Sequence, residues 1–499
     1  MSGGFRSRTK RAKEQAAQEA IHGEKKPSPR RDDGARRPRR ARDSRDSGEP
    51  RGRNAGVGSI GDPARQAAFD AVLRVEVEDA FGNLVLPQIL RERKITGRDA
   101  AFATEIAYGT LRTLGVLDAV IANCSSRPLD GLDPAVLTAL RLGAYQLLFT
   151  RVDDHAAVDT SVRLVAAAGA EKAKGFVNGI LRTVSRTSVE KWMDKLTPDG
   201  EIAAVAFRTA HPEWIAQSFA RVVGTDELEE ALQADSQRPI VHLVARPGEM
   251  SAEELALVTG GEEGRYSPYA VYLDEGGDPG SLAPVRDKMA AVQDEGSQLI
   301  ARAVAELPVA DDGGRWLDLC AGPGGKAALM GSLAAIDGAR VDAIEVSATR
   351  ADLIRKSTEG MPVTVHVADG RDPGLEPGYD RVLVDAPCSG LGALRRRPEA
   401  RWRKSEEDIA ELTKLQSELL ASAVRLAKPG GVIVYSTCSP DERETRGIVD
   451  KQLAAGDADE LDVRDVLPEM GDLGPHVSAQ MWPHRHGTDA MFLAALRKR

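Results

Sequence analysis

The chain has 499 residues, of which 42% are hydrophobic and only four are cysteine. This length predicts about three domains, each with enough apolar residues for its own core. No apolar run of about 18 residues and no short apolar N-terminal stretch occur, which excludes a membrane span and a secretory signal. The four cysteines are widely spaced and form no C-x-x-C pair, so they indicate neither a disulfide framework nor a metal site. We therefore expect a reduced, cytoplasmic protein.

The first 60 residues differ in composition from the rest of the chain. They contain 17 Lys and Arg against 8 Asp and Glu, a net charge of +9, whereas the whole chain carries −9. Large apolar residues are almost absent there, so we predict a disordered basic tail over residues 1–60. Such a tail on an acidic body can add affinity for phosphates, or it can be a solvated extension without a partner. The sequence leaves both interpretations of the tail open.

Residues 61–190 have apolar residues at helical spacing, as in "PARQAAFDAVLRVEVE" and "DPAVLTALRLGAYQLLFT". Alternating strand patterns are absent, which predicts an all-α bundle.

Residues 191–290 combine helical and strand patterns. "EWIAQSFARVVGTDELEEALQADS" predicts two helices, whereas "PIVHLVARPG" and "YAVYLDEGG" predict strands. We expect a small α/β module of about four strands there.

Residues 291–499 alternate between apolar runs and helical stretches. The runs are "RWLDLCAG", "RVDAIEVS", "PVTVHVAD", "DRVLVDAP" and "GGVIVYST". Continuous apolar strands that alternate with helices predict a buried, mostly parallel, doubly wound sheet. In such a sheet, ligands bind beyond the carboxyl ends of the strands.

A glycine-rich turn follows the first of these strands, and it is a candidate cofactor site. Glycines let the backbone pass close to a ligand, and the free N–H groups of the following helix attract polar or anionic groups. The dinucleotide fingerprint G-x-G-x-x-G is not matched. The turn comprises Cys320, Ala321, Gly322, Pro323, Gly324, Gly325 and Lys326.

Acidic residues end the next two strands. Glu345, in "AIEVS", can accept both hydroxyl groups of a ribose, and Asp369, in "VADGRD", can accept an exocyclic adenine amine. Each acid alone would be an ordinary surface residue or helix cap. Together with the glycine turn they outline an adenosine site, which would fit a sulfonium and a carboxylate as well as a phosphate.

Two cysteines stand at equivalent strand ends, Cys388 in "VDAPCSG" and Cys438 in "STCSP". A thiolate is a strong nucleophile, and its addition to C6 of a pyrimidine makes C5 reactive enough to accept a methyl group. That chemistry needs a nucleophile, a group for proton release and an acid near N3. The sequence supplies side chains of these three kinds in Cys438, Cys388 and Asp385. We expect Cys124, in the helical region, to be a packing residue.

The motifs "LCAGPGGK", "DAPCSGLGALRRRPEARW" and "YSTCSP" resemble those of the RsmB (Sun/Fmu-type) family of 16S ribosomal RNA cytosine-5 methyltransferases. "QDEGSQL" is similar to the segment before that family's first strand. The helical region, ending "GFVNGILR", resembles a NusB-type RNA-binding domain. The resemblance implies a NusB-like bundle over 61–190, a small α/β RNA-binding module over 191–290, and a Rossmann-like class I methyltransferase domain over 291–499.

The same resemblance implies methylation of cytosine C5 in 16S ribosomal RNA, with S-adenosyl-L-methionine as the cofactor. We also expect no metal and a monomer, although the sequence does not determine the oligomeric state. Cys438 would attack C6, Cys388 would assist product release, and Asp385 would bind the base. Cys388 stays a rival nucleophile, because DNA cytosine methyltransferases use the Pro-Cys cysteine. The turn Cys320–Lys326, Glu345, Arg350, Asp369 and Asp385 would contact the cofactor or the base.

Some features depart from the family pattern or leave alternatives. "VHLVARPG" replaces the usual arginine-valine-asparagine strand of the middle module, and "TDAMFLAAL" is a variant that keeps Phe492. Residues 394–404 hold six basic side chains, for which we predict phosphate contacts; Trp402 would pack or stack on a base. The alternative functions are the same chemistry on transfer RNA or another RNA, and a non-catalytic RNA-binding or ribosome-assembly factor.

Overall fold

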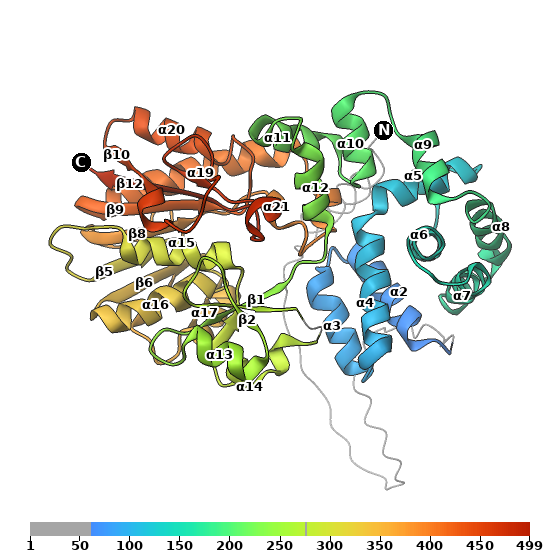
Figure 1. The fold of residues 1–499 in the computed structure, drawn as a ribbon, viewed down its shortest axis with the longest axis horizontal. Helices are drawn as coiled ribbons and strands as arrows, with labels where there is room; N and C mark the ends of the chain where they lie inside the picture. Colours follow the sequence, from blue (N-terminus) through green and yellow to red (C-terminus); the bar gives the residue numbers. More distant parts are fainter. Residues whose placement is uncertain (1–60, 275–276) are drawn as a thin grey trace, which may run out of the picture.

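The computed structural model describes residues 61–274 and 277–499. The tail predicted to be disordered, residues 1–60, lies outside the described residues. Figure 1 shows helices on one side of the molecule, the large sheet on the other, and a small sheet beneath the large one. No helix within the described ranges combines the length and the apolar composition that a membrane span requires.

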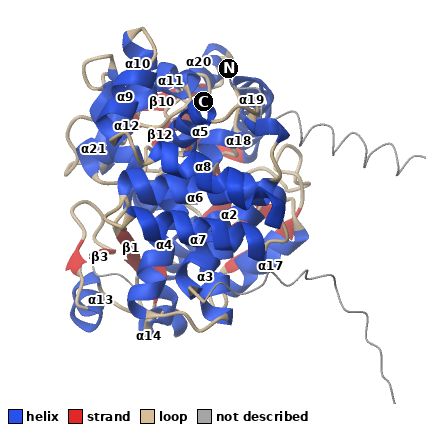
Figure 2. Cartoon of the chain, turned by 90° about the vertical axis from the view of Figure 1, so that its right-hand side faces the viewer, coloured by secondary structure: helices blue, strands red, loops and turns tan. Residues whose placement is uncertain are grey.

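The helical part begins where the sequence predicts it. Pro63 is the first helical residue, and the carboxylate of Asp62 caps the helix by accepting the Arg65 N–H at 3.0 Å. Buried side chains from all eight helices, among them Phe69, Leu117 and Leu140, form one core. Figure 2 shows these helices stacked in front of the strands. They are α2 (Pro63–Val77), α3 (Gly82–Glu92), α4 (Gly97–Arg112), α5 (Leu114–Cys124), α6 (Pro134–Phe149), α7 (Asp154–Ala167), α8 (Lys174–Val184) and α9 (Val189–Leu196).

Three helices and a small sheet connect the helical part to the large sheet. The helices are α10 (Glu201–Arg208), α11 (Glu213–Val223) and α12 (Leu228–Ser236), and they pack on Leu391, Leu394 and Trp482 of the C-terminal part. The small sheet has the order β2-β3-β1-β4 and is antiparallel. Its elements are β1 (Val241–Ala245), α13 (Ala252–Thr259), β2 (Glu262–Glu263), β3 (Ala270–Leu273), α14 (Ala283–Arg286) and β4 (Ala290–Val292).

The large sheet has the order β10-β12-β9-β8-β5-β6-β7, with β11 paired to β12. The five strands from β9 to β7 are parallel, and β12 and β10 add an antiparallel edge. The sheet's strands are β5 (Arg315–Asp318), β6 (Arg340–Glu345), β7 (Val363–Val367), β8 (Tyr379–Asp385), β9 (Ala427–Thr437), β10 (Ala458–Leu461), β11 (Ala479–Gln480) and β12 (Phe492–Lys498).

Helices cover both faces of this sheet. Residues of α15 (Glu295–Glu306) and α16 (Gly325–Asp337) share one core with the sheet, and residues of α19 (Glu406–Leu426) and α20 (Arg446–Ala454) share a second core with it. The remaining helices are α17 (Ala348–Ser357), α18 (Ala400–Arg403) and α21 (Pro483–His486). The all-α bundle, the small α/β module and the Rossmann-like, mostly parallel sheet confirm the predicted fold class.

Candidate active site

The glycine turn lies between the end of β5 at Asp318 and the start of α16 at Gly325. Gly324 has a φ of +115°, which other residues rarely adopt. A Cβ atom on Gly322 would overlap the Glu345 carboxylate and touch the Arg350 guanidinium. The turn therefore passes so close to the end of β6 that only glycine fits there.

The two cysteines predicted at strand ends lie side by side. β8 and β9 are parallel neighbours with Asp385 opposite Ser436, so the loops that follow them meet at one edge of the sheet. The Sγ atoms of Cys388 and Cys438 are 3.4 Å apart, and both residues are half-buried. The contact with Cys438, together with burial, raises the pKa of the Cys388 thiol well above its ordinary value.

Asp385 and Lys326 form an ion pair beside the thiols. Lys326 Nζ lies 2.8 Å from Asp385 Oδ2, and the Ser436 hydroxyl donates to Asp385 Oδ1 at 2.9 Å. Burial lowers the pKa of Lys326, but the Asp385 carboxylate and the charge of Cys438 raise it by more, so the amine stays protonated. The sequence pattern assigned Lys326 to the cofactor turn. Its side chain pairs with Asp385 and interacts electrostatically with Cys438.

Glu345 and Arg350 join the second strand end to the glycine turn. Glu345 is only 5% exposed, and its Oε1 accepts the Ser347 N–H at 2.8 Å. Arg350 Nε lies 3.5 Å from Glu345 Oε2, while Arg350 Nη2 donates to the Gly322 carbonyl at 2.6 Å. The structure thus brings Glu345, Arg350 and the turn together, as the sequence analysis expects.

Asp369 lies at the edge of this group. It follows β7 by two residues, and its carboxylate is ion-paired at 2.6 Å with the Arg371 guanidinium, itself 3.2 Å from Glu418. The side chain is half-exposed. The hydrogen bond from Arg371 lowers the pKa of Asp369, so the carboxylate is ionised at neutral pH.

Asp318 is a site residue that the sequence analysis missed. It is the last residue of β5 and is fully buried. Its Oδ1 accepts the Cys320 N–H at 3.3 Å, but its Oδ2 has no hydrogen-bond partner among the described residues. Burial, and then the Asp385 charge, raise the pKa of Asp318 to about 7. An acidic residue inside the apolar run "WLDL" is the signal that could have revealed it.

These residues fit S-adenosyl-L-methionine. The buried Asp318 oxygen needs a donor such as an ammonium group, and Gln293, whose Oε1 is buried without a partner in the described structure, lies next to Gly325. Glu345 stands at the end of the second strand, where a carboxylate can accept ribose hydroxyls. The turn between them leaves no room for a side chain at Gly322.

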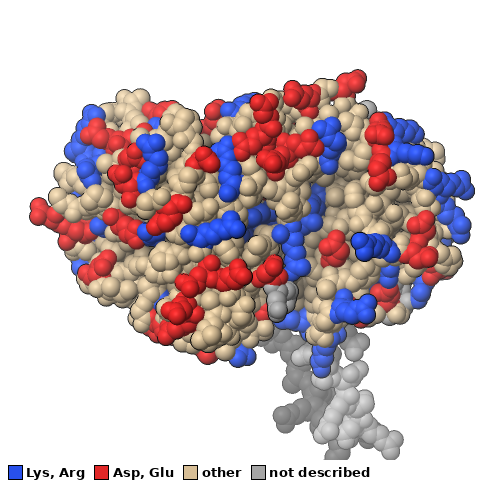
Figure 3. Space-filling view, in the orientation of Figure 1, with Lys and Arg blue, Asp and Glu red and all other residues tan. Residues whose placement is uncertain are grey.

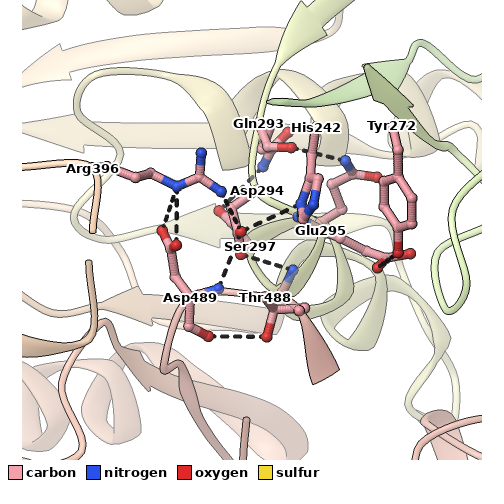
Figure 4. A network of polar contacts seen from close by, with 12 residues as sticks. His242, Tyr272, Gln293, Asp294, Glu295, Ser297, Arg396, Thr488 and Asp489 are labelled. Atoms are coloured by element: carbon pink, nitrogen blue, oxygen red, sulfur yellow. Dashed lines mark hydrogen bonds and ion pairs between the residues drawn. The ribbon is translucent and has the colours of Figure 1, made fainter. Parts of the chain in front are cut away.

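The first part of the basic segment 394–404 binds acidic side chains of the protein. Figure 4 shows Arg396 joined to Asp294 and Asp489, with His242 of the small sheet on the far side of Asp294. Arg396 lies 2.7 Å from Asp294 and 2.9 Å from Asp489, and Arg395 lies 2.6 Å from Asp489. Burial raises the pKa of Asp294, but the His242 hydrogen bond and the arginine charges hold it well below its ordinary value.

The second part of this segment contacts the helical part of the molecule and the connecting helices α10–α12. The Trp402 indole N–H donates to the Leu111 carbonyl at 2.9 Å, and the ring packs against Gly115. Arg401 is fully buried and donates to the Ala210 carbonyl at 3.1 Å. Arg403 donates to the carbonyls of Val75, Asp79 and Ala80.

The phosphate contacts predicted for this segment are therefore wrong for Arg395, Arg396, Arg401 and Arg403, because protein groups occupy their guanidinium groups. Arg397 is exposed, with its guanidinium 5.5 Å from the centre of the Phe81 ring. Trp402 packs between domains. Sequence alone could not reveal this, because the partners lie up to 328 residues away in the chain.

The sheet order, the glycine turn and the acidic strand ends are those of a Rossmann-like methyltransferase domain, and a helical bundle is joined to it. Residues 307–497 match the model of the 16S rRNA methyltransferase RsmB/F family, and residues 62–186 match that of the NusB family. The chain belongs to the RsmB/F family of 16S rRNA methyltransferases.

Two relatives and one solved structure illustrate the similarity. The putative methyltransferase Rv1407 of Mycobacterium tuberculosis is 55% identical over 88% of this chain and 97% of its own length. The ribosomal RNA small subunit methyltransferase B of Cronobacter sakazakii is 34% identical over 76% of this chain and 87% of its own length. The crystal structure of PH0851 shares the fold, with a TM-score of 0.76 and 24% identity over 88% of this chain and 99% of that one.

Proposed function

We propose that this protein methylates C5 of a cytosine in 16S ribosomal RNA, with S-adenosyl-L-methionine as the methyl donor. The observation that carries the proposal is the Cys388–Cys438 pair, with 3.4 Å between the sulfur atoms, next to the Asp385–Lys326 ion pair and the glycine turn. A protein that only bound RNA would not need two half-buried thiols at this place. The family to which the chain belongs supports ribosomal RNA as the substrate.

Cys438 is the nucleophile in this proposal. Its thiolate adds to C6 of the cytosine, a carbon–sulfur bond forms, and the electron pair of the C5–C6 double bond makes C5 nucleophilic. S-adenosyl-L-methionine supplies an electrophilic methyl group when bound. The C5 proton then passes to solvent, the C5–C6 double bond re-forms, and the C6–sulfur bond breaks, so that Cys438 leaves as a thiolate. Cys388, 3.4 Å away, is the group placed to assist this release.

Asp385 and Lys326 manage charge beside the reacting ring. Addition at C6 puts negative charge on the ring, and a proton or a hydrogen bond at N3 stabilises it. Asp385 is held by Lys326 and by the Ser436 hydroxyl, so its orientation is fixed before the base arrives. Lys326 is a cation that interacts with Cys438, whereas the pKa of the Cys388 thiol is raised. This environment supports Cys438, rather than Cys388, as the attacking sulfur.

The RNA must present an unstacked base to reach these sulfur atoms, which favours a single-stranded, loop or flipped cytosine. Figure 3 shows basic side chains gathered along the junction between the large-sheet part and the helical part of the molecule. Several of the segment's arginines hold the domains together, so the phosphate contacts of this proposal come from exposed basic residues such as Arg397.

Methyl transfer from labelled S-adenosyl-L-methionine to small-subunit ribosomal RNA tests the proposal. Cys438→Ala should abolish transfer, whereas Cys388→Ala should accumulate a covalent protein–RNA adduct that survives denaturing electrophoresis. Retention of activity by Cys438→Ala would refute the assignment of the nucleophile. Transfer to transfer RNA but not to ribosomal RNA would establish the alternative substrate, and no transfer to any RNA would favour a binding or assembly factor.

A further inference from the structure

Glu444 lies beneath the cysteine pair, although no motif drew attention to it. The residue is completely buried, six residues after Cys438. Its Oε1 accepts the Ser389 N–H at 2.8 Å and the Gln416 amide at 3.0 Å, and its Oε2 accepts the Ser389 hydroxyl. In the described part of the chain, three hydrogen-bond donors thus converge on the carboxylate.

These bonds fix both cysteine loops to each other. Ser389 follows Cys388 and Ser439 follows Cys438, and their hydroxyl oxygens lie 3.2 Å apart. Gln416 of α19 also donates to the Pro387 carbonyl at 2.9 Å, and the Tyr435 hydroxyl donates to the Glu444 carbonyl at 2.7 Å. Glu444 is therefore the centre of a buried network that sets the position of Cys388 relative to Cys438.

The charges around the two sulfur atoms are opposite in sign. Glu444 is an anion on the side of Cys388. The contact with Cys438 and burial raise the pKa of the Cys388 thiol, and the charge of Glu444 raises it further. Lys326 is a cation that interacts with Cys438. The other titratable groups that face the pair are Asp385 of β8, which Lys326 neutralises, and Tyr435 of β9, whose pKa burial raises well above its ordinary value.

We propose that Glu444 is a positioning residue: its carboxylate fixes the Cys388 loop and keeps the proton on Cys388, so that Cys438 carries the negative charge and attacks. The inference rests on the proposed cytosine-C5 chemistry and explains how two adjacent, chemically identical thiols acquire different roles. It also predicts that Cys388 enters the reaction as a thiol hydrogen-bonded to the Cys438 sulfur.

Alkylation by iodoacetamide tests the proposal without RNA or cofactor, because only a thiolate displaces iodide. The full-length protein is treated from pH 6 to pH 10, and each cysteine is quantified by mass spectrometry, with Cys124 as an internal reference. At pH 7 we expect Cys438 to react about tenfold faster than Cys388 or more, since one pKa unit is a tenfold change in thiolate. Equal rates in the unmodified protein would overturn the proposal.

Glu444→Gln removes the charge and keeps groups that can bond to Ser389, so the alkylation profile of Cys388 should move to lower pH. Glu444→Asp keeps the charge and should leave Cys388 slow to react, even where its shorter side chain reduces methyl transfer. Glu442→Gln, at an exposed carboxylate two residues away, is the matched control and should change neither profile. An unchanged Cys388 profile in a folded Glu444→Gln protein would overturn the proposal.

If Glu444→Gln loses cooperative thermal unfolding, the unmodified protein and Glu444→Asp decide the question: fast alkylation of Cys388 in either would overturn the proposal. The test is separate from that of the proposed function. An RNA assay that fails while the two cysteines still alkylate at different pH values would refute the methyl transfer but not the proton placement. If the two cysteines alkylate equally in an enzyme that methylates RNA, the proton placement is refuted but the methyl transfer is not.

Discussion

Replacement of Asp318 by Asn should make the protein more stable at high pH and leave its stability nearly unchanged at low pH. Burial and the Asp385 charge raise the pKa of Asp318 to about 7 from the ordinary 3.8. The folded state therefore holds a proton that the unfolded state has lost, and the free energy of unfolding falls as the pH rises from about 4 through about 7. Integrated over that range, the free energy of unfolding falls by about 4 kcal/mol. Asn does not ionise, so the variant shows no such loss.

The measurement is urea unfolding of both proteins at pH 5 and at pH 8.5, monitored by circular dichroism. About 3 kcal/mol of the loss falls between these two pH values. Asn keeps an oxygen for the Cys320 N–H, so packing is preserved. Asp380→Asn is the control. Burial raises the pKa of Asp380, but the Lys428 ion pair and the backbone N–H groups of Gly313 and Arg315 together lower it by more. Its ionisation therefore changes only below the ordinary value, and the effect of the substitution should be the same at both pH values. A difference between Asp318→Asn and the unmodified protein that does not change with pH would refute the reasoning.

Three further changes test other parts of the structure. Burial, and then Arg401, lower the pKa of His211 to about 4, so neutral His211 contributes fully to the free energy of unfolding above pH 6.5, and this contribution is lost as the pH falls toward 4. In urea unfolding, His211→Gln should remove this loss of about 3 kcal/mol at acid pH. An equally steep loss in the variant would contradict the prediction. Trp402→Ala should lower the stability of the domain junction by about 3 kcal/mol, visible in calorimetry as separate transitions for the helical and large-sheet parts; a single unshifted transition would show that Trp402 does not couple them. Gly322→Ala should weaken S-adenosyl-L-methionine binding at least about tenfold in calorimetric titration, since its Cβ would displace Glu345. Gly175→Ala is the control and should leave binding unchanged, because the added carbon meets nothing within 4 Å.

The sequence by itself determined the succession of helices and strands, because hydrophobic periodicity, proline and glycine act within a few residues. It also determined that Cys388, Cys438, Asp385 and Glu345 stand at strand ends. In a parallel sheet, such ends share one edge, so their convergence follows from the order of the strands.

Only the tertiary structure decided which charged groups act as partners. The sequence analysis assigned no role to Glu444 or Asp318. Burial makes Asp318 unusual, and Glu444 accepts hydrogen bonds from Ser389 and Gln416, which are far from it in the chain. The arginines of residues 394–404 looked like phosphate ligands, since a run of positive charge is usually solvated. The folded chain pairs four of them with carboxylates and carbonyl groups far away in the sequence, because an ion leaves water only where partners replace its hydration. These four are Arg395, Arg396, Arg401 and Arg403.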